Sequence, residues 1–453
     1  MTLKVKLLKN MMRTKAYGSA LIIVLMFSFG LCHVSAETML PAQSTFGDIE
    51  PSVAMRDFRS MRLTGSRSQD SLLGELIFES PRLLGGMARN TGISCDTCHI
   101  RGDRNPDFFI PGGSDHPGSF NGAAFLFNPS SGQISQTAII IPSLFGISER
   151  SRFGHDGRTD TLRNFIHDVI VKEFSGTEPS HHTLDLVTAY VADLEKRPNS
   201  RLAATGILKD PTTPEAEGQI LFFKPFPESN KSCATCHMPE RQFSDDVLHV
   251  LDKRTLRTAS LTDRNDAVRY FHDGRSPNLR DAINQKNSEY KIGLSESEID
   301  ALIAYLKIVE TVDQPQQPAT ADLALSEIAD ARLGLQYAVA SGDMETLAIA
   351  ADGFSRKLQL LAAEFDAFSN EADSSPARRA AIAAIADATI AIFKLRTYAE
   401  EDQLDEITAA YAAVQVKLDE MAQPVRNGAQ SSLFSFERLK AYREKIGRPL
   451  RRP

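Results

Sequence analysis

The feature that most constrains this chain is a five-residue pattern that occurs twice. Cys95-Asp96-Thr97-Cys98-His99 and Cys233-Ala234-Thr235-Cys236-His237 both read C-x-x-C-H, and they contain four of the five cysteines. Two thiols three positions apart can be alkylated by the two vinyl groups of one porphyrin, and the adjacent histidine then lies beneath the iron. The pattern predicts two covalent haem c groups, attached at both cysteine pairs, with His99 and His237 as proximal ligands.

Two other uses of paired cysteines compete with this interpretation. A zinc knuckle and a redox-active C-x-x-C both use cysteines at this spacing. Neither explains why a histidine follows the second cysteine in both copies.

The two motifs belong to a larger internal repeat. The helix-like segments 73–78 and 217–223 precede them, and the stretches 153–158 and 270–275, which share His-Asp-Gly-Arg, follow them. Each half closes with an apolar helical pattern, at 185–191 and at 300–306. We therefore expect an all-α fold with two cytochrome c-like haem domains in tandem, at 50–200 and 210–312.

The remainder of the chain is cysteine-free and rich in alanine. It follows Pro315-Gln316-Gln317-Pro318, a linker by composition, and contains apolar stripes at helical spacing. Ser375-Pro376 has the form of a helix start. We expect an antiparallel bundle of about four helices at 321–445, acting as a stability or docking module because it contains no cluster of titratable residues.

The N-terminus has the form of a secretory signal. Five basic residues precede the apolar run 20–32, and Val34-Ser35-Ala36 offers a cleavage site after residue 36. An uncleaved anchor is the alternative, although the run is short for a membrane span. Residues 1–36 are therefore expected to be a signal peptide that directs the chain to the periplasm.

The net charge of -7 gives the chain no excess of positive charge of the kind that binds nucleic acid.

From about residue 70 to residue 310 the order of motifs resembles the bacterial di-haem cytochrome c peroxidases, including their MauG-like branch. The resemblance includes Ile141-Pro142-Ser143-Leu144 and Thr258-Ala259-Ser260-Leu261, each of which precedes a His-Asp-Gly-Arg stretch. It implies that the N-terminal haem is the peroxide site and that the C-terminal haem receives electrons from a donor.

The same resemblance suggests residues for the first haem. Glu173 corresponds to the family's distal glutamate, a general acid-base, and the alternative is a solvated charge. His116, in a glycine-rich loop, corresponds to a histidine that ligates the resting iron and leaves on activation; the alternative is a plain loop residue. His155 and His272 occupy identical motifs and are not expected to be ligands, whereas Arg158 and Arg275 are candidates to pair with haem propionates.

Three departures from the family pattern stand out. Phe165 occupies the place of a distal glutamine, and the chain has no tryptophan, a residue that the family often places between the haems where His155 stands here. The second half also lacks the methionine or tyrosine of its relatives as sixth ligand. Lys286, with Tyr290 close by, is the nearest candidate.

The sequence thus predicts an exported oxidoreductase that reduces hydrogen peroxide with electrons from a small redox protein, a cytochrome c or a cupredoxin. One alternative is a MauG-like oxidation of a partner protein. The other is a di-haem electron-transfer cytochrome without catalysis.

Overall fold

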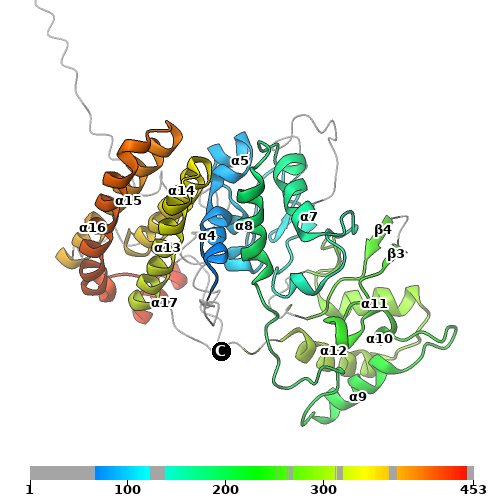
Figure 1. Ribbon diagram of the computed structural model, residues 1–453. Coiled ribbons are helices and arrows are strands. Elements are labelled where there is room, and N and C mark those ends of the chain that lie inside the picture. Colours follow the sequence, from blue (N-terminus) through cyan, green and yellow to red (C-terminus); the bar gives the residue numbers. More distant parts are fainter. Residues whose placement is uncertain are drawn as a thin grey trace, which may run out of the picture. The chain divides into compact units, whose positions relative to one another are not determined.

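The chain is mostly helical in the computed structural model, which agrees with the all-α prediction at that level (Figure 1). The structure describes residues 67–122, 138–251, 254–262, 264, 269–311, 313, 320–366 and 375–445. The predicted signal peptide, the start of the first repeat unit and the linker at 315–318 lie outside these ranges. Within them, no helix has the length and apolar character needed to cross a membrane.

The first repeat unit begins with a helix whose start is set by Ser68. The Ser68 side chain accepts a hydrogen bond from Ser71 N, as an N-cap residue does. The α-helices of this unit are α4 (Gln69–Glu79), α5 (Gly86–Asn90), α6 (Cys95–Cys98), α7 (Leu162–Asp168) and α8 (His181–Ala192). A π-helical turn, Val169–Glu173, directly follows α7.

The second repeat unit has the same plan. Thr212 and Glu215 form a capping box at the start of its first helix, where Pro214 is also placed favourably. Its helices are α9 (Thr213–Phe223), α10 (Cys233–Cys236), α11 (Leu279–Glu289) and α12 (Glu296–Glu310). Short 3₁₀ turns complete the described chain, at Pro81–Leu83, Ile100–Gly102, Ile147–Glu149, Pro239–Arg241 and Ala429–Ser431.

One glycine in each unit lets two helices pack in contact. A Cβ atom on Gly74 of α4 would lie 2.1 Å from Leu186 O of α8, and one on Gly218 of α9 would lie 1.9 Å from Ala301 O of α12. Neither position can accept a larger side chain without separating the helices. The two glycines occupy corresponding places in the sequence repeat, so the repeat is also a repeat of packing.

Short strands, which the sequence analysis did not anticipate, occur where the two units meet. In antiparallel pairs, β1 (Ser119–Phe120) pairs with β2 (Ile139–Ile140), and β3 (Leu248–Leu251) pairs with β4 (Arg254–Arg257). Ile140 N donates to His272 O and Arg257 N donates to His155 O, both at 2.8 Å. Each unit thus uses a strand end to hold the His-Asp-Gly-Arg loop of the other.

Four long helices follow the second unit, as the apolar stripes predict. They are α13 (Ala321–Ser341), α14 (Met344–Asp366), α15 (Pro376–Glu400) and α16 (Leu404–Gly428), and the shorter α17 (Phe436–Lys445) comes after them. Ser375 caps α15 by accepting from Arg378 N, with Pro376 at the first helical position, as the sequence indicates.

The C-terminal helices, α13 to α16, do not form a separate core. One continuous cluster of buried apolar residues runs from α4 and α8 into α13 and α14 and on to α15 and α16. The second repeat unit has its own smaller cluster, centred on Phe222, Phe243 and Tyr305. In energetic terms the C-terminal helices are therefore part of the first unit, since they bury the same apolar surface.

Buried ion pairs accompany this shared core. Lys357 of α14 donates to Glu75 at 3.1 Å and to Glu79 at 2.6 Å, both on α4. Arg101, two residues after the first motif, forms a bidentate pair with Glu327 of α13 at 2.6 and 2.7 Å. These pairs border a cavity of about 60 Å³ between the first unit and the C-terminal helices.

The two carboxyl groups that share Lys357 differ in proton affinity. Burial would raise the pKa of Glu75, but Lys357 and Arg67 lower it to about 2. Burial raises the pKa of Glu79 to about 8, because Glu75 and Asp96 add to the penalty and only Lys357 opposes it. One oxygen of Glu79, Oε2, is buried and has no hydrogen-bond partner among the described residues. Glu79 is therefore the member that holds a proton near neutral pH.

The protonation of Glu79 predicts a pH dependence of stability. The folded protein keeps a proton on this group up to a pH of about 8, whereas an unfolded glutamate loses it near about 4.3. Between these values the folded state binds more protons, so the free energy of unfolding falls as the pH rises. Glu75 does not contribute to this slope, because its stabilisation is complete above its unfolded pKa. Denaturant titrations at pH 5, 6, 7 and 8 should show a smaller fall in E79Q than in the parent.

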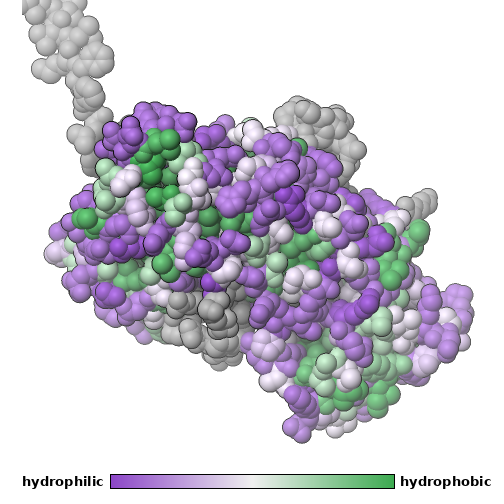
Figure 2. All heavy atoms as spheres, viewed as in Figure 1, coloured by the Kyte–Doolittle hydropathy of each residue, from purple (hydrophilic) through white to green (hydrophobic). Residues whose placement is uncertain are grey.

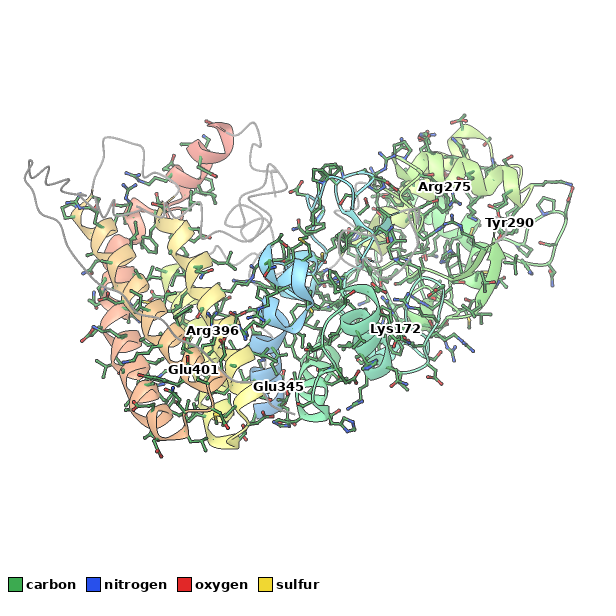
Figure 3. The ribbon with its side chains drawn as sticks, turned by 90° about the horizontal axis from the view of Figure 1, so that it is seen from above. Lys172, Arg275, Tyr290, Glu345, Arg396 and Glu401 are labelled. Atoms are coloured by element: carbon green, nitrogen blue, oxygen red, sulfur yellow. The ribbon has the colours of Figure 1, made fainter. Side chains whose placement is uncertain are left out.

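A control variant tests whether the loss of any glutamate charge would change the pH dependence of stability in the same way. Glu345 is exposed at the start of α14, so E345Q should keep the pH dependence of the parent (Figure 3). Equal slopes in the parent protein and in E79Q would show that Glu79 does not titrate in this window.

Candidate haem-binding and catalytic site

The two C-x-x-C-H motifs fold in the same way. Each forms one turn of helix, α6 or α10, in which the side chain of the third motif residue accepts a hydrogen bond from the backbone N–H of the preceding serine. This bond joins Ser94 N to Thr97 Oγ1 at 3.0 Å and Ser232 N to Thr235 Oγ1 at 2.8 Å. The helical turn places the two cysteines of a motif one turn apart on the same side.

The histidine of each motif is oriented by a backbone carbonyl. His99 Nδ1 lies 3.0 Å from Pro142 O, and His237 Nδ1 lies 3.0 Å from Phe243 O. A proton on Nδ1 would satisfy the carbonyl and leave Nε2 free as a metal ligand, which is the usual arrangement at metal-binding histidines. Burial lowers the pKa of His99 to about 4 and also lowers that of His237, so both rings are neutral, as ligation requires.

Each histidine also has a backbone hydrogen bond to an equivalent part of the repeat, although the Nδ1 partner of His237 is Phe243 O. Pro142 is the second residue of Ile141–Leu144, and Ala259, in the equivalent place of the second unit, also hydrogen-bonds His237 through its backbone. The sequence analysis noted these stretches as landmarks but assigned them no role. Their position before each His-Asp-Gly-Arg stretch is the signal that could have indicated one.

None of the four motif cysteines forms a disulfide bond within the described part of the chain. Burial raises the pKa of Cys95 to about 12 and that of Cys233 to about 11, and it raises those of Cys98 and Cys236 as well. A redox-active C-x-x-C depends on a stabilised thiolate, which is the opposite shift. Paired thiols on one helical turn beside a neutral, oriented imidazole therefore fit a covalently attached haem c.

Glu173 lies at the end of the π-helical turn that follows α7, a type of helical irregularity that is frequent at functional sites. Its carboxylate forms an ion pair with Arg158 of the first His-Asp-Gly-Arg stretch, and 29% of its side chain is exposed. Burial raises the pKa of Glu173, and the ion pair with Arg158 opposes that rise only in part. The group is accessible to a small solute and holds its proton to a higher pH than an ordinary glutamate.

Arg158 connects the other residues singled out in this region. It donates to both Asp156 and Glu173, and its guanidinium carbon lies 4.9 Å from the centre of the Phe165 ring. The structure thus brings together Glu173 and Phe165, the two residues for which the resemblance implies a position on the distal side of the first haem. The partners of Arg158 among the described residues are carboxylates of the protein, Asp156 and Glu173.

His116 lies against the second repeat unit. Its Nδ1 is 3.2 Å from Pro117 O and its Nε2 is 3.1 Å from Asp273 O. The absence of a side chain at Gly274 makes room for the ring, because a Cβ atom there would lie 2.2 Å from His116 Nε2. To ligate an iron atom, His116 would have to give up the contact with Asp273.

His155 and His272 face each other across the junction of the two units. Their ring centres are 6.5 Å apart, and His155 Nε2 lies 3.2 Å from Ile140 O. Burial lowers the pKa of His155 to about 4, with a further contribution from Arg257, so its ring is neutral. This symmetric placement agrees with a structural task shared by both units.

Lys286 of α11 is near enough to His237 for its charge to help burial lower the pKa of that histidine. Its Nζ is 2.8 Å from Glu289 and 5.4 Å from the ring centres of both Phe271 and Tyr290. Tyr290 and Arg275 lie on this unit (Figure 3). Ligation by Lys286 would require the loss of its proton and of the ion pair with Glu289.

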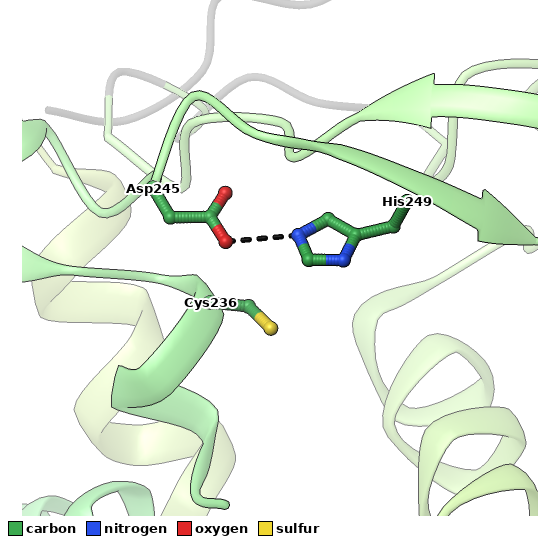
Figure 4. A group of neighbouring side chains, drawn as sticks. All are labelled: Cys236, Asp245 and His249. Carbon is green, nitrogen blue, oxygen red and sulfur yellow. Dashed lines mark hydrogen bonds and ion pairs between the residues drawn. The ribbon is translucent and has the colours of Figure 1, made fainter.

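A cysteine, an aspartate and a histidine meet next to the second motif. The ligand atoms of Cys236, Asp245 and His249 lie within 4.8 Å of one another, and Asp245 accepts from His249 at 2.8 Å (Figure 4). Such a set could hold a zinc ion only if Cys236 were a free thiolate. Since burial raises the pKa of this thiol and it belongs to a C-x-x-C-H motif, the three residues fit better as the surroundings of a thioether-bonded haem edge.

Apolar side chains are exposed near the second motif. They are Met238, Val247, Val250 and Tyr290, of which Val250 is 77% exposed. On the face drawn in Figure 2, hydrophobic patches lie among a mainly hydrophilic surface. Exposed apolar groups beside a redox centre are suited to brief contact with another protein.

Comparison with known proteins does not assign the chain to a family. No family model matches it, and no curated protein matches it. Among solved structures, a hydrazine synthase of Kuenenia stuttgartiensis pressurised with xenon is similar at 19% identity and a TM-score of 0.39, covering 56% of this chain and 92% of that one. A MauG-like protein associated with microbial copper homeostasis is similar at 17% identity and a TM-score of 0.38, covering 57% and 94%.

Proposed function

We propose that this chain is an exported di-haem c-type oxidoreductase that reduces hydrogen peroxide with electrons from a small redox protein. The observation that carries the proposal is the duplicated site in which two cysteines on one helical turn accompany a neutral histidine oriented through Nδ1. Export is part of the proposal because c-type haem attachment in bacteria generally follows secretion.

Bound iron would supply the redox chemistry that reduces the O–O bond, using two electrons and two protons to give two water molecules. The protein residues supply the proton movement. Glu173 can take a proton from one peroxide oxygen and deliver it to the other, as a general acid-base with a raised pKa does. Arg158 fixes the carboxylate in place through their ion pair.

The two units are proposed to have different roles, peroxide reduction in the first and contact with the electron donor in the second. The first contains Glu173 and Arg158, whereas the exposed apolar side chains near the second motif would provide a contact surface for a cytochrome c or a cupredoxin. His116 would ligate the first iron in the resting state, and its movement to the contact with Asp273 would open the first site. Lys286 is the proposed sixth ligand of the second haem. The paired imidazoles of His155 and His272 lie at the junction between these sites.

The first test is the haem content of the mature protein. We expect two haems per chain that persist through denaturing gel electrophoresis, because thioether bonds survive unfolding. The measurement is haem staining of the gel combined with the haem-to-protein ratio from absorption. C233A/C236A should retain one haem, and a parent ratio near zero or one would contradict the proposal.

A further inference from the structure

One buried arginine connects the C-terminal helices to the first attachment helix, α6. Arg356 of α14 donates through Nη1 to Gly92 O at 2.8 Å and through Nη2 to Thr97 Oγ1 at 3.0 Å. Thr97 is the middle residue of the first motif and is fully buried, and Arg356 is only 4% exposed. The guanidinium is therefore held at a fixed place against the helix that carries Cys95 and Cys98.

The charge on Arg356 is not neutralised by a direct partner. Among the described residues no carboxylate forms an ion pair with it, and its buried Nε atom has no hydrogen-bond partner. The acids that face it at longer range are Asp96 on α6, Glu79 on α4 and Asp352 on α14 itself, and Asp352 is already paired with Arg396. Since a guanidinium stays protonated in proteins, a buried positive charge is fixed beside α6.

The second repeat unit has the same motif without this cation. Thr235 corresponds to Thr97 and takes the same bond from the preceding serine, but its side chain is exposed. No arginine among the described residues donates to it. The buried cation of the first site therefore comes from α14, and the motifs also differ in local sequence, because Asp96 of the first corresponds to Ala234 of the second.

We propose that the buried charge of Arg356 raises the reduction potential of the first haem relative to that of the second. The C-terminal helices would thus act on the first haem through this side chain. This inference rests on the proposed function, in which a haem is attached at Cys95 and Cys98. Reduction adds one electron to the haem, and a nearby buried cation stabilises the form with the extra negative charge. An electron from the proposed donor would therefore be drawn from the second haem to the first.

The test is a redox titration of the purified holoprotein, with the haems assigned by comparison with C233A/C236A. In R356Q the midpoint potential of the first haem should fall by about 59 mV. For a one-electron couple this is about a tenfold change in the equilibrium constant. The second haem should keep its potential. R356K retains the charge and should stay near the parent value.

Arg378 provides a matched control. It is another buried arginine, 5% exposed, near the start of α15, and among the described residues it makes no hydrogen bond with α6. R378Q should leave both potentials unchanged, so a shift in R356Q would not be a general result of losing a buried arginine.

The possible results separate the two proposals. A parent protein without covalent haem overturns the proposed function, whereas two haems with an unshifted first potential in R356Q overturn only the role of Arg356. If R356Q does not accumulate as a folded protein, R356M carries the same expectation, because an apolar chain of similar length fills the space without a charge. An equal shift in R356K would also contradict the charge-based explanation.

Discussion

Replacement of Glu173 by glutamine is expected to lower peroxide turnover by about a hundredfold or more while both haem spectra persist. The amide has nearly the same shape as the carboxyl group but cannot exchange a proton at neutral pH, and loss of a general acid-base typically has an effect of this size. The measurement is steady-state peroxide reduction with a reduced donor protein, together with the absorption spectrum of each variant.

Glu178 is the matched control for this experiment. It belongs to the same segment, its side chain is 70% exposed, and it pairs with His167. E178Q should therefore turn over peroxide at the parent rate. If E173Q does the same, Glu173 is a surface charge that pairs with Arg158 and has no part in proton transfer.

Replacement of Lys357 by methionine should destabilise the first repeat unit by about 3–5 kcal/mol. Lys357 is the common partner of Glu75 and Glu79. Its removal leaves the buried Glu75 carboxylate with Arg67 as its remaining cation and leaves Glu79 without one among the described residues, and loss of one member of a buried ion pair is strongly destabilising. In denaturant unfolding of the holoprotein, the midpoint of the transition that includes α4 and α14 should move to a lower denaturant concentration.

An exposed lysine on the C-terminal helices shows what loss of charge alone does. Lys417 on α16 pairs at the surface with Glu420 at 2.8 Å, and pairs of this kind contribute little to stability. K417M should unfold at the same denaturant concentration as the parent protein. A K357M variant that is as stable as K417M would mean that α4 and α14 do not depend on this ion pair.

Much of the helical structure could be predicted because its signals are local. The apolar segments 73–78 and 217–223 lie within α4 and α9, and the closing patterns at 185–191 and 300–306 lie within α8 and α12. Capping residues such as Ser375 act within three or four positions of themselves. These signals depend on spacing along the chain, which the sequence contains in full.

The relation of the C-terminal helices to the rest of the chain could not be predicted in this way. Their apolar stripes show that they must bury one face, but a stripe does not identify its partner. The sequence analysis treated them as an independent module, whereas the structure gives them one apolar core with α4 and α8. The strands at the junction were also missed, because segments of two to four residues carry little pattern of their own.

The sequence alone determined the chemistry proposed for the two motifs, because the cysteines and the histidine on which the proposal rests lie within five consecutive residues. Only the tertiary structure decided the surroundings of these groups. Pro142 O reaches His99 across 43 positions, Arg158 reaches Glu173 across 15, and Arg356 reaches Thr97 across 259. Hydrogen bonds and buried charges act through distances in space, and the folding of the chain alone sets those distances between residues far apart in sequence.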